Sequence, residues 1–257
     1  MFPLHSPLLL NSKRISHGYF GRQGGVSEGV FESLNCGFGS ADDRAHVHEN
    51  RCRVANALGT DFDHLITAYQ VHSANVVHVT EPWTREASPR ADGMVTQVSG
   101  IALGVLAADC APVLFVDDES GVIGSAHAGW QGAFTGVLEG VVEQMIFLGA
   151  KRERIRACVG PCISQVSYEV GPEFYHRFCD QGVVNAQFFL RAERAGYWMF
   201  DLPRYVLHRL EAAGVTLAEA LGACTYSEEQ RLFSFRRTTH RQQVEYGRNM
   251  SAIMLVT

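Results

Sequence analysis

Three short, almost uniformly apolar runs lie close together in the middle of the chain, and they restrict its possible folds more than any other feature. They span residues 101–107, 112–117 and 122–126. Runs of this length and composition are typical of strands that are buried on both faces or packed tightly on one. The sequence DESG at 118–121 is a turn signal between the second and third runs. We therefore expect consecutive buried strands in this region.

The flanking segments add helices and further strands. Apolar residues at helical or strand spacing predict helices at 132–148 and 203–213, and strands at 75–80 and 155–159. Gly149 and Gly214 are suited to end the two helices. Because strands and helices alternate, the sequence predicts an α/β (or α+β) class, with helices packed on a mixed sheet. We expect a single domain over residues 1–257.

Composition and charge exclude several classes of protein. Hydrophobic residues make up 46% of the chain and charged residues 19%, which is ordinary for a soluble protein. No window approaches 18 unbroken apolar residues, so we expect no transmembrane helix and no membrane partner. The apolar patch at 8–10 lacks the flanks of a secretory signal, which favours a cytoplasmic protein.

Charge is mixed along the chain and the net charge is −5, so no basic face for nucleic acid is expected. The C-terminal part nevertheless contains a basic cluster, formed by Arg231, Arg236, Arg237, His240, Arg241 and Arg248. On an acidic protein such a cluster suggests a small anionic ligand or a contact between subunits.

The chain has seven cysteines at irregular spacings, which does not suggest a disulfide framework. We interpret most of them as small buried hydrophobic residues. Cys158 and Cys162 flank a Gly-Pro pair, with no second cysteine pair nearby, and are interpreted as turn and core residues.

Three segments place a metal-ligating side chain at the edge of a predicted strand. His72 precedes the strand at 75–80, Cys110 interrupts two apolar runs, and His127 follows the run at 122–126. Two imidazoles and a thiolate leave one tetrahedral position open, which is the pattern of a catalytic zinc site. Copper is an alternative metal for this ligand set. For His72 and His127, the alternative interpretation is a side chain that is hydrogen-bonded and binds no metal.

Neighbouring residues are candidates for supporting roles. Asp109 could orient a ligand or cap a turn. Gly129 and Trp130 begin the helix after His127, where free N–H groups could bind an anion. Arg22 lies in a glycine-rich loop and could hold an anionic ligand, or it could be a solvated residue in an ordinary turn.

Taken together, the motifs resemble one family. In order along the chain they are HGYFGRQGGVSEG, SLNCGFG, HENR, QVHSANV, ADGMVT, ADCAPVLFVD, AHAGWQGAF, VGPCIS, YEVG, CTYSE, FSFRR and GRNMSAI. This set is similar to the YfiH/laccase-domain family, also called the polyphenol oxidase family or YfiH-like purine nucleoside phosphorylases. The match covers about residues 16–253.

The resemblance implies the YfiH-like α/β fold, also described as a cysteine hydrolase fold, with His72, Cys110 and His127 as metal ligands. It implies phosphorolysis of adenosine, inosine and methylthioadenosine, and deamination of adenosine. The partners would be a purine nucleoside and phosphate; the oligomeric state is left open. For these reactions we expect Asp109 to shuttle a proton, and Arg22 and the amides near Gly129 to hold phosphate.

Two other functions remain open. In a thiol hydrolase, Cys110 would be the nucleophile, His127 its base and His72 an orienting group, with no metal. Removal of a wrongly added amino acid from a peptidoglycan precursor, which the resemblance also implies for some members, would suit that arrangement. A copper-dependent polyphenol oxidase ranks last, because only His46 and His48 form an HxH motif.

Overall fold

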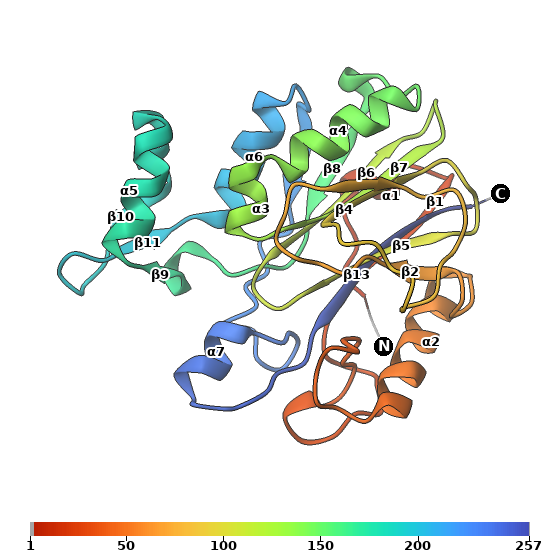
Figure 1. Ribbon diagram of the computed structural model, residues 1–257, viewed down its shortest axis with the longest axis horizontal. Helices are drawn as coiled ribbons and strands as arrows, with labels where there is room; N and C mark the ends of the chain where they lie inside the picture. The colour runs from red at the N-terminus through yellow and green to blue at the C-terminus, as the bar shows by residue number, and fades with distance from the viewer. Residues whose placement is uncertain (1–2, 257) are drawn as a thin grey trace.

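The central apolar runs form strands that belong to two different sheets. The computed structural model describes residues 3–256, and Figure 1 shows its architecture. The four-stranded sheet has the order β1-β13-β5-β2. Its strands are β1 (Ile15–Phe20), β13 (Asn249–Leu255), β5 (Ala102–Ala107) and β2 (Leu65–Thr67). Only the pairing of β2 with β5 is parallel, so this sheet is mixed.

The second sheet has six strands in the order β12-β8-β6-β7-β4-β3. They are β12 (Leu217–Ala220), β8 (Arg156–Val159), β6 (Ala111–Asp117), β7 (Val122–Ala128), β4 (Gly93–Thr96) and β3 (Val76–His78). Its two edge pairings are parallel and its central pairings antiparallel. The expected α/β class with a mixed sheet is confirmed, and the chain passes from one sheet to the other between β5 and β6.

The alternation of side chains along the strands explains how the layers pack. In β6, Leu114 and Val116 belong to the cluster between the two sheets, whereas Val113 and Phe115 belong to the cluster under the helices. Residues two apart share a face of a strand, so both faces of β6 are apolar. Each buried side chain of this size contributes roughly 1.5–3 kcal/mol relative to an exposed one.

Helices cover both outer faces of this pair of sheets. Helices α3 (Trp130–Thr135), α4 (Val137–Phe147) and α6 (Leu202–Ala212) lie over the six-stranded sheet, and α2 (Arg44–Leu58) lies over the four-stranded sheet (Figure 1). The helix expected at 132–148 is therefore two helices. The break falls at Gly136, whose φ of 108° is a left-handed conformation that ends α3 and begins α4.

A small aromatic unit extends from the sheets and was not predicted from the sequence. It contains β9 (Glu169–Val170), α5 (Pro172–Gln181), β10 (Phe189–Arg191) and β11 (Trp198–Phe200), and it projects on the left of Figure 1. The stacked rings of Tyr175 and Trp198, 3.9 Å apart, hold α5 on its three strands. The remaining helices are α1 (Pro7–Leu10) and α7 (Phe235–His240).

No helix within residues 3–256 combines the length and the apolar character that crossing a membrane would require.

Candidate metal centre

The fold brings His72, Cys110 and His127 together. Their ligand atoms all lie within 4.8 Å of one another, and Sγ of Cys110 is 3.9 Å from Nε2 of His72. Cys110 lies in the crossover between the two sheets and His72 in the turn before β3. His127 was expected just after its strand, but it lies inside β7, which continues to Ala128 because Ala111 pairs with Ala128.

The carboxylate of Asp92 connects two of these ligands, and the sequence interpretation missed it. It accepts hydrogen bonds from the backbone N–H groups of Val71, His72 and Ser73 and from the Ser73 hydroxyl, at 2.7–3.1 Å. Its Oδ1 also lies 2.9 Å from Nδ1 of His127. Asp92 thus fixes the turn that carries His72 and directs Nε2 of His127 toward the centre.

Two residues at the centre have left-handed backbone conformations that are unusual for residues with side chains. The φ angle is 61° at His72 and 96° at Asp109. Such conformations cost roughly 1–3 kcal/mol and persist only where surrounding contacts hold them. The Asp92 hydrogen bonds supply those contacts at His72, and the hydrogen bonds of its own carboxylate supply them at Asp109.

The electrostatics of the centre favour a thiolate beside an imidazolium. Burial alone would raise the pKa of the Cys110 thiol, but the charge of His127 and hydrogen bonds from both histidines lower this pKa to about 6. Burial opposes the charge on His127, but Cys110 and Asp92 raise its pKa to about 9. Hydrogen bonds from His127 and Ser73 overcome burial and hold the pKa of Asp92 at about 2.

The centre has room for a metal ion because residue 129 is glycine. A Cβ atom at Gly129 would lie 2.8 Å from Sγ of Cys110 and 3.1 Å from Cδ2 of His72. The absence of this atom keeps the space among the three ligands open. One sulfur and two ring nitrogens at these separations suit zinc with an open position. The residues therefore fit a metal ion.

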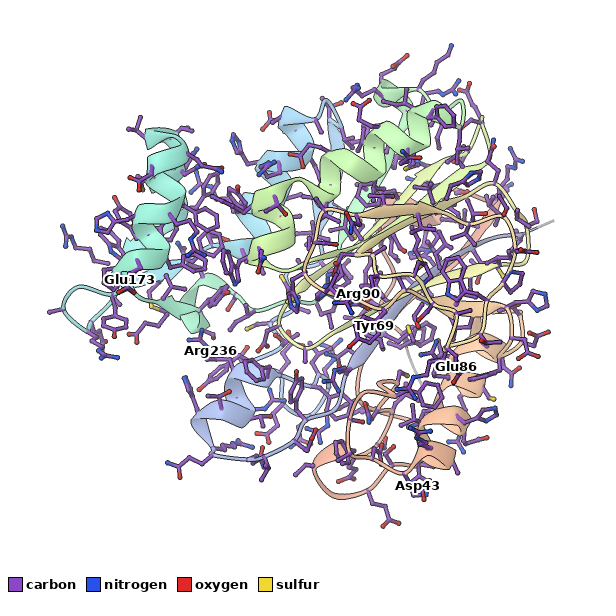
Figure 2. The ribbon with its side chains drawn as sticks, in the orientation of Figure 1. Asp43, Tyr69, Glu86, Arg90, Glu173 and Arg236 are labelled. Atoms are coloured by element: carbon purple, nitrogen blue, oxygen red, sulfur yellow. The ribbon has the colours of Figure 1, made fainter. Side chains whose placement is uncertain are left out.

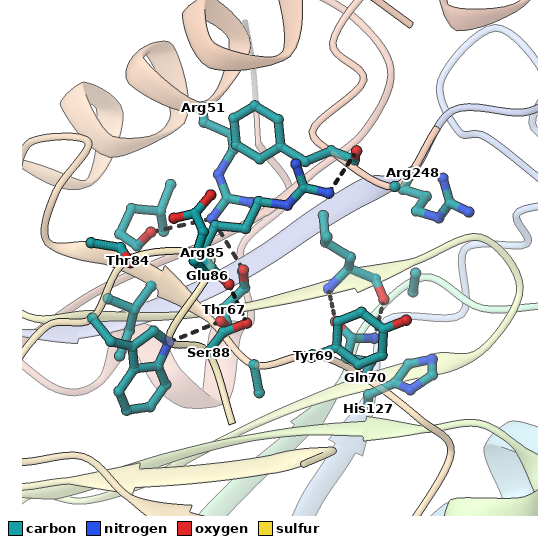
Figure 3. Close-up of a pocket in the computed structure, with 18 of the residues that line it drawn as sticks. Arg51, Thr67, Tyr69, Gln70, Thr84, Arg85, Glu86, Ser88, His127 and Arg248 are labelled. Atoms are coloured by element: carbon teal, nitrogen blue, oxygen red, sulfur yellow. Dashed lines mark hydrogen bonds between the residues drawn. The ribbon is translucent and has the colours of Figure 1, made fainter. Parts of the chain in front are cut away.

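The three ligands line one wall of a large cavity. Its volume is about 980 Å³, which lies near the upper end of the range for ligand pockets. Apolar and aromatic residues, including Tyr69, Trp83 and Leu106, form part of its lining. Figure 3 shows Gln70 and His127 on one side of this cavity and Arg51 and Arg85 on the other.

Asp109 adjoins the centre, but its carboxylate is engaged elsewhere. One oxygen accepts from the Thr225 hydroxyl and the other from the backbone N–H of Arg236, each at 2.6 Å. Asp109 therefore ties the crossover to the start of α7. This agrees with the turn-capping alternative more closely than with a proton shuttle, because each oxygen already accepts a hydrogen bond from another segment.

Two other candidate residues lie outside the lining of the cavity. The guanidinium of Arg22 donates to the carbonyl oxygens of Glu32 and Glu229, at 2.7 and 3.1 Å. It therefore joins two loops. The ring of Trp130 packs 5.0 Å from that of Phe174 and belongs to the aromatic unit. Gly129 is the helix-start residue that reaches the centre.

The basic cluster of the C-terminal region is divided in the structure. Arg231 and Arg241 form ion pairs with Glu228 and Glu229. Figure 2 shows Arg236, a residue of α7, away from Tyr69 and Arg90 near the cavity. Of the arginines in the cluster, only Arg248 lines the cavity.

Comparison with known sequences places this geometry in context. A family model described as "Multi-copper polyphenol oxidoreductase laccase" matches residues 16–256. A purine nucleoside phosphorylase of Deinococcus radiodurans is 41% identical over 87% of this chain and 84% of its own length. One from Bacteroides thetaiotaomicron is 31% identical over 96% of this chain and 94% of its own length.

Solved structures share the same architecture. YlmD from Geobacillus stearothermophilus superposes with a TM-score of 0.88 at 28% identity, covering 98% of this chain and 94% of that one. The hypothetical protein YfiH from Bacillus licheniformis gives a TM-score of 0.86 at 30% identity, covering 94% and 92%. These likenesses extend over nearly the whole of each chain.

Proposed function

The chain belongs to this laccase-domain, YfiH-like family, as its motifs predict, and we propose that it is a metal-dependent purine nucleoside phosphorylase. The proposed substrates are adenosine, inosine and methylthioadenosine, with phosphate as the second substrate. One observation carries the proposal: a three-ligand centre opens onto a cavity with room for a nucleoside and a phosphate. The names of the curated relatives support the reaction type.

Phosphorolysis exchanges one bond for another at the anomeric carbon of the ribose. A phosphate oxygen forms a bond to this carbon, and the bond from the carbon to the purine nitrogen breaks. The purine leaves with the electron pair of the broken bond and takes up a proton. A bound metal ion supplies a Lewis acid that stabilises negative charge in the cavity.

The chain's own residues hold the metal ligands and the substrate in place. Asp92 keeps the Nδ1 proton of His127, so Nε2 of that ring stays directed at the centre. Trp83, whose indole N–H donates to the carbonyl of Thr67 at 3.1 Å, is a fixed aromatic surface in the cavity. With Leu106 it offers a purine ring an environment of low polarity.

Turnover of inosine and adenosine with phosphate tests the proposal directly. We expect free purine base and ribose 1-phosphate to form, to stop forming after chelation, and to form again when zinc is added. Cys110→Ala, which removes the thiolate ligand, should reduce metal affinity and turnover by more than the roughly 10–100-fold typical of residues that only orient ligands. Failure of a folded, zinc-loaded protein to release any purine base would exclude this function.

Adenosine deamination at the same site is a lesser part of the proposal. It requires a proton donor beside the purine amine, and both oxygens of Asp109 are already hydrogen-bonded. If Asp109→Asn retained full deaminase activity with metal bound, its role as a shuttle would be excluded. We rank a multicopper oxidase lower still, because the described part of the chain has only one cluster of three metal-ligating side chains.

A cysteine hydrolase is the second candidate, and the position of Asp92 favours it. Cys110, His127 and Asp92 follow one another in the order nucleophile, base and orienting carboxylate. The orienting group expected from the sequence was His72, but Asp92 is the residue that holds Nδ1 of His127. The corresponding substrate would be the amide of a peptidoglycan precursor that carries a wrongly added amino acid.

Chelation separates the two candidates. A metal-free hydrolase would cleave a muramyl–amino acid amide at the same rate before and after chelation, and would lose activity when Cys110 is alkylated. A phosphorylase would lose its activity under both treatments. Amide cleavage that survives chelation, in a protein that leaves nucleosides intact, would favour the hydrolase.

A further inference from the structure

One side of the cavity is cationic, and within residues 3–256 its arginines hydrogen-bond only to carbonyl and hydroxyl oxygens, which do not neutralise their charge. Arg51, Arg85 and Arg248 line the cavity; Figure 3 shows Arg51 and Arg85 together, and Arg248 packs against Gly37, next to Phe38 in the chain. The guanidinium carbons of Arg51 and Arg85 lie 5.2 and 5.3 Å from the centre of the Phe38 ring, so these two positive charges share one aromatic side chain. Within residues 3–256, no carboxylate forms an ion pair with any of the three.

Arg51 is a buried cation with an unused donor. Its side chain rises from α2, and the residue is only 5% exposed. One terminal nitrogen donates to the Leu65 carbonyl and the Thr67 hydroxyl, at 3.3 and 3.2 Å, but the buried Nε has no hydrogen-bond partner in the described chain. Burial lowers the pKa of Arg51 to about 10, and neighbouring Arg85 contributes in the same direction. The group is nevertheless charged at neutral pH.

Arg248 presents a second unused donor from a different part of the chain. Its buried Nη1 likewise has no partner among the residues described, although its other terminal nitrogen lies 3.4 Å from the Tyr246 hydroxyl. Gly37 leaves room for this side chain, since a Cβ atom there would lie 2.8 Å from Cδ of Arg248. The Arg248 side chain therefore occupies space that is available only because residue 37 is glycine.

Acidic side chains do not neutralise this region. Asp63 and Glu86 also line the cavity, but both are exposed and neither forms an ion pair with these arginines. By contrast, Arg154 and Arg209 elsewhere in the fold are paired with Asp117 and Glu139. Unsatisfied buried donors on uncompensated cations are costly, and their retention in one cavity indicates an anionic ligand.

We propose that Arg51, Arg85 and Arg248 form a phosphoryl-binding subsite in the same cavity as the metal centre. Guanidinium groups match the oxygen spacing of phosphate and can each donate two hydrogen bonds to it. The subsite deepens the proposed function, on which its identification with the phosphate of phosphorolysis rests. It replaces Arg22, whose guanidinium already serves two carbonyl oxygens.

Direct binding measurements test the subsite without depending on turnover. The metal-containing protein is titrated in a calorimeter with inorganic phosphate, with adenosine monophosphate and with adenosine. Arg248→Gln and Arg85→Gln remove one cation each, and Arg204→Gln makes the same charge change on the exposed surface of α6. The thermal midpoint of each variant reports whether it is folded.

We expect Arg248→Gln to weaken binding of the phosphoryl ligand by about 10–100-fold, the usual loss for charge-assisted hydrogen bonds, and Arg204→Gln to leave it unchanged. The more exposed Arg85 should have the same effect to a smaller extent. Binding of inorganic phosphate identifies a free co-substrate, whereas binding of the monophosphate alone identifies a phosphate ester on the substrate. Both results support the subsite.

Other results would overturn the subsite. These are the absence of binding by either phosphoryl compound, affinities that are equal in folded Arg248→Gln, Arg85→Gln and wild-type proteins, or loss of binding only in Cys110→Ala, which would place the phosphate on the metal. Arginine-dependent phosphate binding in a protein that cleaves no nucleoside would exclude the phosphorylase and leave the subsite standing. The two proposals therefore fail separately.

Discussion

At the metal end of the cavity the polar side chains hydrogen-bond to one another, whereas the arginines at the other end form few hydrogen bonds and no ion pair within residues 3–256. Asp92 is saturated with hydrogen bonds and fixes both His72 and His127. Arg51 and Arg248 each keep a buried nitrogen without a partner in the described chain. The difference indicates that the first end is organised before any substrate arrives, and that the second is completed by its ligand.

Replacement of Asp92 should have the largest effect on this contrast, because it removes the organisation of the metal end. Asp92→Asn should weaken metal binding by roughly 10–100-fold, since the ring of His127 loses its charged partner and the His72 turn loses one of its two acceptor oxygens. Zinc affinity measured by competition with a chromophoric chelator checks this result. Asp117→Asn, a change at another buried aspartate remote from the ligands, should keep wild-type affinity. Equal losses in the two variants would contradict the role given to Asp92.

The pH dependence of thiol alkylation should show the organisation of the metal end in the absence of metal. With a pKa of about 6, Cys110 is mostly thiolate at pH 7, and its reaction with iodoacetamide should fall roughly tenfold for each unit below pH 6. Burial raises the pKa of Cys36 to about 12, so this thiol should stay unmodified throughout. Peptide mapping by mass spectrometry distinguishes them. A midpoint near pH 9 for Cys110 would show that the histidines do not stabilise its thiolate.

Gly129→Ala should fill the space for the metal without disturbing the fold. The φ of −62° at this position suits alanine, but the new Cβ would crowd the Cys110 sulfur. Overpacking of this kind predicts a loss of about tenfold in zinc affinity. Gly171→Ala is the matched control, because Gly171 also precedes a helix and has no atom closer than 3.6 Å to the added carbon. Unchanged zinc binding in Gly129→Ala would argue against a metal at this position.

Arg22 should give the smallest effect on ligand binding. Arg22→Gln removes its hydrogen bonds to Glu32 and Glu229, which should lower the free energy of unfolding by about 1–2 kcal/mol. Phosphate affinity should stay at the wild-type value, because this guanidinium lies outside the cavity. Urea denaturation and calorimetry measure the two quantities. A weaker phosphate affinity in the folded variant would restore Arg22 to the ligand site.

The sequence could predict the elements whose patterns are local. The apolar runs predicted β5, β6 and β7, because burial on both faces of a strand leaves no polar alternation. The division of these strands between two sheets could not be predicted, since pairing depends on distant segments such as β13 and β2. The single predicted helix at 132–148 was wrong at Gly136, where the apolar stripe continues across a left-handed residue.

The sequence predicted the parts of the site that depend on residue type. It could not predict those that depend on the direction in which a side chain points. Histidine and cysteine at strand edges indicated the three ligands, which the fold brings together. Asp92 was visible in the motif ADGMVT, but nothing local shows that its carboxylate turns toward residues 71–73. Asp109 and Arg22 have suitable side chains that point to other partners. Of the basic cluster that suggested an anionic ligand, only Arg248 lines the cavity. The other arginines of the proposed subsite are Arg51 from α2 and Arg85 from a distant loop.

Because Cys110 lies in the crossover between β5 and β6, a metal ion bound there would also change the stability of the fold. Cys110 lies where the chain leaves one sheet for the other, and His127 belongs to a strand of the second sheet. An ion held by both would fasten this crossover to β7, and free metal at 100 times its dissociation constant would add about 2.7 kcal/mol to the free energy of unfolding. The cell's supply of the metal would then govern how long each copy of the protein survives proteolysis, as well as how fast it works.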